Sequence, residues 1–238
     1  MRSSVLYGVI LLLSIAAALV PTLIPGIDLA VSTYFMQPNA PLQTKGWLWV
    51  ELINEHIPTI FRTWAILCLP AWWLARKSIR CRQWAHPIAF VGLALLLGPG
   101  LSVSALKEVT QRARPLHVTE FGGDKKFSPA LQIANQCHDD NCSFVSGHTA
   151  DGFFLVSLML LSPRRRAWWV VFGVLSGVLI GFARVSVGAH WLSDALWAFP
   201  VTLLASGLVW WALNRFKDRS TDRLQDSKGS LAPGQHPN

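Results

Sequence analysis

The sequence has 238 residues, of which 52% are hydrophobic and only 14% are charged. A soluble domain of this length normally carries more charge, so the composition argues against a soluble protein. The formal net charge of +8 is compatible with nucleic-acid binding. However, the basic residues form short clusters between apolar runs rather than one polar face. We therefore expect a polytopic membrane protein that binds no nucleic acid.

Six apolar runs approach the roughly 20 residues that a helix needs to cross the hydrocarbon core. They predict an all-α protein, a six-helix membrane bundle with spans at residues 5–24, 57–75, 87–106, 148–161, 168–187 and 192–213. The fourth run is short because Pro163 and three arginines follow it, so it lies deep in the fold or crosses a locally thinned bilayer. The first run follows Arg2 as a signal peptide would. Its length, and the presence of Pro21 and Pro25 where a cleavage site should be, favour a retained membrane anchor.

The distribution of lysine and arginine predicts the orientation of these spans. If the N-terminus is cytoplasmic, most of the 21 basic residues fall on the cytoplasmic side, and tryptophans cluster at the same ends. We expect residues 1–214 to form one membrane domain and residues 215–238 to form a disordered cytoplasmic tail. The segment 25–56 then lies outside, with a short interfacial helix around Trp47–Ile53.

Three polar clusters adjoin the predicted spans: Lys107–Pro115 (KEVTQRARP), Ser143–Thr149 (SFVSGHT) and Arg184–Asp194 (RVSVGAHWLSD). In the six-span topology all three fall at outer ends, on one side of the membrane. Snorkelling and loop solvation explain a cation such as Arg112. They do not explain two histidines and further cations set against apolar sequence. The clusters therefore predict a functional site on the outer side.

The cations of these clusters have the chemistry of a phosphate site. Lys107, Arg114 and Arg184 can surround a phosphoryl group, and arginine offers a planar fork that matches phosphate oxygens. Ser146 and Gly147 begin the fourth span, where the free N–H groups of a helix N-terminus attract an anion. Gly147 lets the backbone approach closely, and Ser146 equally suits a plain N-cap.

The histidines supply a nucleophile and an acid. His190 and Asp194 are four residues apart, so at the start of a helix they share a face and the carboxylate orients the imidazole. An oriented neutral histidine can attack phosphorus and form a phosphohistidine. His148, on the neighbouring span, can then protonate the leaving oxygen and later activate water.

These residues resemble the signature of the type 2 phosphatidic acid phosphatase superfamily, which includes glucose-6-phosphatase and vanadium haloperoxidases. Its pattern is K-x6-R-P, then P-S-G-H, then S-R-x5-H-x3-D. Lys107 and Arg114-Pro115 fit the first part at the right spacing, while Val145 replaces the usual proline and Ala183 the usual serine. The resemblance implies the roles given above, with His190 as nucleophile. It also implies a metal-independent reaction without a cofactor. The implied partners are a phosphorylated lipid, as the substrate, and the surrounding membrane lipids.

A narrower resemblance lies in the run Cys137–His148, which looks like the Cys/Asn-rich stretch before Phe-Val-Ser-Gly in bacterial lipid A phosphatases. It implies a bacterial inner membrane with the active site facing the periplasm. Other members act on undecaprenyl pyrophosphate, phosphatidylglycerol phosphate or phosphatidic acid, and the catalytic residues do not separate these substrates. The oligomeric state is not predicted.

Two cysteines, Cys137 and Cys142, share the long polar loop between the third and fourth spans. In an oxidising compartment a disulfide is the first interpretation. Free thiols are the second. Metal binding with His138, Asp139 and Asp140 is the third, because no standard ligand spacing is present.

Two functions of other classes remain open at this point. A vanadium-type haloperoxidase would use the same anion pocket, but those relatives are soluble. An anion transporter would place charges along a path through the bilayer, whereas here they collect at one face. The Gly98-Pro99-Gly100 break in the third span would suit a transporter, but a kink in a packed bundle explains it as well.

Overall fold

The computed structural model describes residues 3–37, 39–40, 42–137 and 142–229. Among these residues the secondary structure is helical, apart from one isolated bridge between Val118 and Lys125, and the predicted all-α class is confirmed. The α-helices are α1 Ser3–Leu23, α2 Gly26–Met36, α3 Leu48–Lys77, α4 Ala85–Leu95, α5 Val103–Thr110, α6 Gly147–Ser157, α7 Arg166–Ser186 and α8 Leu192–Gly229. A π-helical segment, η2 Leu96–Ser102, joins α4 to α5.

In the described part of the chain, five helical segments are long and apolar enough to cross a membrane. They are Ser3–Leu23, Leu48–Lys77, Arg82–His117, Pro163–Ser186 and Leu192–Arg215. These segments correspond to five of the six predicted spans. The fourth predicted span forms α6, which has 11 residues. At about 1.5 Å per residue it reaches roughly 16 Å, well short of the ~30 Å hydrocarbon core. A sixth span therefore stays a prediction.

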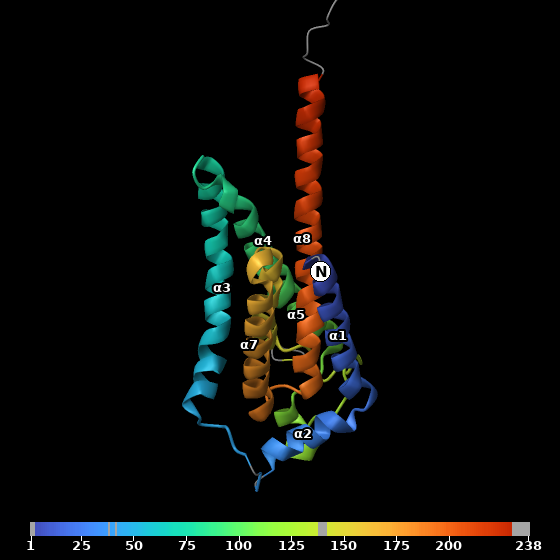
Figure 1. The fold of residues 1–238 in the computed structure, drawn as a ribbon. Coiled ribbons are helices and arrows are strands. Elements are labelled where there is room, and N and C mark those ends of the chain that lie inside the picture. The colour runs from blue at the N-terminus through green and yellow to red at the C-terminus, as the bar shows by residue number, and fades with distance from the viewer. Residues whose placement is uncertain (1–2, 38, 41, 138–141, 230–238) are drawn as a thin grey trace, which may run out of the picture.

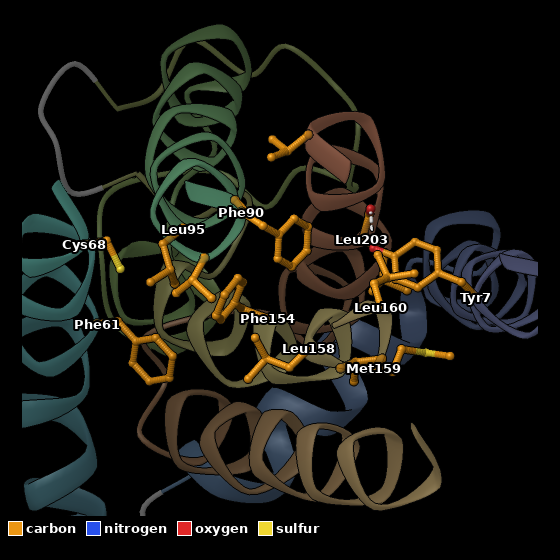
Figure 2. Packing of buried hydrophobic residues seen from close by; sticks show 14 residues of the cluster. Tyr7, Phe61, Cys68, Phe90, Leu95, Phe154, Leu158, Met159, Leu160 and Leu203 are labelled. Atoms are coloured by element: carbon orange, nitrogen blue, oxygen red, sulfur yellow. Dashed lines mark hydrogen bonds between the residues drawn. The ribbon is translucent and has the colours of Figure 1, made fainter. Parts of the chain in front are cut away.

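The short helix α6 lies inside the bundle. Most of its residues are buried. Figure 2 shows Phe154 of α6 and Leu158 of the following turn, η5 Leu158–Leu160, packed among side chains of α3 and α4 such as Phe61 and Phe90. A helix that is covered on all sides contacts protein rather than lipid, so its length need not match the bilayer.

Glycines bring α7 unusually close to α6. Gly173, Gly177 and Gly181 recur every four residues on one face of α7. A Cβ atom on Gly173 would lie 2.4 Å from the backbone nitrogen of Val156, and one on Gly181 would lie 3.3 Å from Cγ2 of Thr149. Small residues at this spacing let helix backbones approach in membrane proteins. The last turn of α7 is thereby held against the first turn of α6.

The segment before the second span differs from the prediction. The expected interfacial helix and the span are one 30-residue helix, α3, which contains Pro58 and Pro70. Proline is tolerated in such helices because neighbouring groups satisfy the freed backbone atoms. A separate helix, α2, lies across the end of the bundle opposite the N-terminus (Figure 1).

At the C-terminal end, α8 continues to Gly229 and extends beyond the bundle (Figure 1). The disordered tail expected from Arg215 stays a prediction. The sequence between these residues contains neither proline nor glycine, so no helix breaker interrupts it before Gly229. Residues 230–238 lie outside the described part of the chain.

Candidate active site

A cavity of about 700 Å³ opens between α3, the α4–η2–α5 segment and α6. Five of the predicted site residues line it: Lys107, Arg114, Gly147, His148 and His190. The rest of its wall comes from α3, the α4–η2–α5 segment and α6, and most of it is apolar, although Arg62, Glu108 and Asp151 also line it. One cavity therefore combines cations and two imidazoles with a largely apolar wall.

The three predicted cations converge on the histidines. Lys107 lies in the last turn of α5, Arg114 follows that helix, and Arg184 lies in the last turn of α7. Arg184 is 8% exposed and sits beside the residues that line the cavity. His148 is close enough to interact electrostatically with all three cations, and His190 with Arg114 and Arg184. Segments far apart in sequence thus form one positively charged site.

At the start of α6, the backbone at Gly147 reaches the cavity, whereas the hydroxyl of Ser146 does not line it. Ser146 occupies the N-cap position but is fully buried, and its Oγ lies 2.8 Å from Oγ1 of Thr149. It is not among the residues that line the cavity, whereas Gly147 is. The phosphate contact expected for Ser146 therefore stays a prediction, while Gly147 brings the helix N-terminus to the cavity wall.

His190 presents one nitrogen to the cavity and is held by the other. It lies in the segment between α7 and α8 and is 1% exposed. Its Nδ1 lies 2.8 Å from the carbonyl oxygen of Ser143. A carbonyl only accepts hydrogen bonds, so Nδ1 carries the proton and Nε2 keeps a lone pair. Burial lowers the pKa of His190 to about 3, and the positive charges of Arg184 and Arg114 add to this effect. The ring is therefore neutral at ordinary pH.

Asp194 supports His190 less directly than predicted. Its Oδ2 is 3.8 Å from Nδ1 of His190, which is too long for a hydrogen bond. The reason is that α8 begins at Leu192, so His190 precedes the helix and the i, i+4 geometry does not apply. Instead, Asp194 accepts hydrogen bonds from the Ser143 hydroxyl and from the Trp191 backbone N–H. Ser143 thus links the carboxylate to the imidazole.

Arg112, which the sequence assigned to snorkelling, is a fully buried residue behind the site. Its Nη1 donates to Oδ1 of Asp194 at 2.6 Å, its Nη2 to Oδ2 of Asp28 at 2.8 Å, and its Nε to the Ser128 carbonyl oxygen at 2.8 Å. The snorkelling interpretation is wrong. The sequence contained a signal for this pairing that was missed. Asp28 is a single carboxylate within the apolar stretch of α2, and such a carboxylate requires a partner.

The sequence comparisons agree with this geometry. A sequence model of the PAP2 superfamily matches residues 87–218. The chain belongs to this superfamily. Membership confirms the resemblance that the three clusters indicated.

Several PAP2 relatives match over long stretches. A lipid A 4'-phosphatase of Francisella tularensis subsp. novicida is 30% identical over 202 residues, which cover 82% of this chain and 89% of that protein. A lipid A 4'-phosphatase of Rhizobium etli is 43% identical over 187 residues, covering 76% of this chain and 64% of that protein. The crystal structure of a PAP2-type phosphatidylglycerolphosphate phosphatase from Bacillus subtilis aligns with a TM-score of 0.49 and 21% identity over 92% of this chain and 98% of that one. The relatives named by sequence are phosphatases, which favours phosphoester hydrolysis over the haloperoxidase alternative.

The loop before α6 in this PAP2 chain carries a disulfide between Cys137 and Cys142, with Cα atoms 5.5 Å apart. The alternative metal ligands His138, Asp139 and Asp140 lie outside the described residues. Among the described residues, no group of three or more histidine, cysteine or carboxylate side chains is placed to hold a metal ion.

Proposed function

We propose that this PAP2 chain removes phosphate from a membrane lipid head group through a phosphohistidine and without a metal ion. The observation that carries the proposal is the placement of His190. Its Nδ1 is fixed by the Ser143 carbonyl, while the ring lines a cavity that also contains His148, Lys107 and Arg114. An oriented neutral imidazole beside clustered cations suits attack on an anionic phosphoryl group.

Binding comes first. Lys107, Arg114 and Arg184 neutralise the phosphoryl oxygens, and the N-terminus of α6 at Gly147 adds backbone N–H groups. These groups supply the positive charge that a metal ion provides in other phosphatases. They also favour the transition state, in which negative charge spreads over the three equatorial oxygens.

Two displacements then follow. Nε2 of His190 forms a bond to phosphorus while the bond from phosphorus to the lipid oxygen breaks, and His148, which enters this step protonated on both ring nitrogens, gives that oxygen a proton. His148 next takes a proton from water, whose oxygen attacks the phosphohistidine and releases inorganic phosphate. Nδ1 of His190 keeps its proton throughout and donates it in a hydrogen bond to the Ser143 carbonyl oxygen, so the resting ring is regained.

The apolar side of the cavity supports a lipid substrate. Phe61 and Ile66 of α3, together with Leu95 and Leu96 of the α4–η2 segment, line the same cavity as the cations. Acyl chains can lie against such a wall while the head group reaches the histidines. The names of the relatives from F. tularensis and R. etli support lipid A, with its 4'-phosphate as the group removed.

The same proposal includes a topology. Residues 1–214 form one six-span domain, with α6 as the buried fourth span, in a bacterial inner membrane. Both termini are cytoplasmic and the active site faces the periplasm. In support, α2 and the start of α8 lie at the end of the bundle opposite the N-terminus (Figure 1), and the basic run Arg164–Arg166 precedes α7 at the other end.

The test is phosphate release by the purified protein from lipid A, undecaprenyl pyrophosphate and phosphatidylglycerol phosphate, each dispersed in detergent. We expect release from lipid A, and His190→Ala should lower it by about three orders of magnitude or more. Preferential release from another lipid would reassign the substrate. Undiminished activity of His190→Ala would contradict the mechanism.

A further inference from the structure

Asn54 contacts two groups of the site with its two oxygens. It is half-buried in α3, at one edge of the bundle (Figure 1). Its backbone carbonyl oxygen lies 3.0 Å from Nε2 of His148, and its side-chain Oδ1 accepts a hydrogen bond of 2.7 Å from Nη1 of Arg184. Asn54 belongs to none of the three sequence clusters, so no motif pointed to it.

The carbonyl of Asn54 is available because of Pro58. In an α-helix the carbonyl of residue i accepts from the N–H of residue i+4. Pro58 is four residues after Asn54, within α3, and proline has no N–H to donate. The carbonyl oxygen can therefore turn to His148, which must donate from Nε2 because a carbonyl only accepts. This contact leaves Nδ1 of His148 to exchange the proton with the leaving oxygen.

The side chain of Asn54 holds one end of the Arg184 guanidinium. Its Oδ1 accepts a hydrogen bond from Nη1, while Nε of Arg184 is buried and has no hydrogen-bond partner among the described residues. Nε and Nη2 form one edge of the guanidinium, and such an edge can bind two phosphate oxygens at once. Anchoring Nη1 fixes the plane of the guanidinium and leaves this edge for substrate.

We propose that Asn54 is a positioning residue for the phosphatase reaction: its Oδ1 aims Arg184 at the phosphoryl group, and its carbonyl, freed by Pro58, holds the ring of His148. The inference rests on the proposed function. One helix turn of α3, outside the family signature, thereby sets both the anion-binding arginine and the general acid.

The two contacts predict two different kinetic signatures. Both are measured with detergent-dispersed lipid A as substrate and with vanadate, a mimic of the phosphorus centre, as inhibitor. Asn54→Ala removes Oδ1 but keeps the carbonyl, so KM and the vanadate inhibition constant should rise about tenfold with little change in kcat. Pro58→Ala restores an N–H that competes for the Asn54 carbonyl. It should lower kcat about tenfold, with KM and vanadate inhibition unchanged.

Pro70→Ala is the matched control, because it makes the same change in α3 outside the residues that line the cavity. It should leave kcat and KM as in the wild type. Melting temperatures in detergent identify variants that fail to fold. If Asn54→Ala and Pro58→Ala behave like the control, or change kcat and KM in the same way as each other, the inference is overturned. His190→Ala, assayed alongside, separates this result from failure of the proposed function, which requires that variant to be inactive.

Discussion

Replacing Arg112 with methionine should severely destabilise the protein. The guanidinium and the carboxylates of Asp28 and Asp194 are fully buried, so the variant leaves two carboxylates without their counter-ion. Removing one partner of a buried ion pair typically costs about 3–5 kcal/mol. For a chain of this size, each kcal/mol lowers the melting temperature by roughly 2–4 °C. The expected fall is therefore about 6–20 °C, measured by circular dichroism in detergent.

A second substitution tests the physical reason. Asp28→Asn in the Arg112→Met background removes one of the two stranded carboxylates, so it should recover part of the lost stability. The control is Lys125→Met, since Lys125 and Asp124 form an exposed pair at 3.4 Å that contributes about 0–1 kcal/mol. A melting temperature of Arg112→Met equal to that of the control, or no recovery in the double variant, would refute the reasoning.

Two further predictions concern packing and metal dependence. Gly173→Ala should destabilise the protein by about 1–3 kcal/mol, because its Cβ would meet the backbone of Val156. Gly8→Ala, which has open space, should be neutral or slightly stabilising in the same melting assay, and equal effects of the two changes would contradict the packing. Phosphate release should continue undiminished in excess chelator, and a loss that a divalent ion restores would contradict a reaction driven by protein cations alone.

The convergence of the proposed catalytic residues could be predicted from the sequence. Lys107, Arg114, His148 and His190 stand near the ends of successive apolar runs, and alternate crossing of the membrane brings such ends to one side. The structure places these four side chains in one cavity. The sequence indicates this site because desolvating ionisable groups at the ends of membrane spans costs free energy. Such groups are therefore usually found there when they serve a function.

The supporting contacts could not be predicted in the same way. Arg112 pairs with Asp28, a residue 84 positions away, and a lone arginine near a span end is usually a snorkelling residue. The expected contact between His190 and Asp194 assumed that both residues lie in a helix, whereas α8 begins at Leu192. Asn54 had one local signal, a proline four residues later, but the sequence does not say which donor takes the freed carbonyl.

The length of α6 does not decide whether it forms the predicted fourth span. The length rule for spans assumes that a helix faces lipid along its whole length. Here α3, α4, η2, α7 and α8 all pack against α6, and the close glycine contacts leave no room for lipid between α6 and α7.

The most direct test is to find where phosphate is held during turnover. Wild-type protein mixed with lipid A carrying a radiolabelled 4'-phosphate, and quenched rapidly in alkali, should yield a labelled peptide that contains His190. The label should be stable in alkali and lost in acid, as a phosphohistidine is. Phosphate bound to another residue, or turnover by the His190→Ala variant at the wild-type rate, would contradict the account.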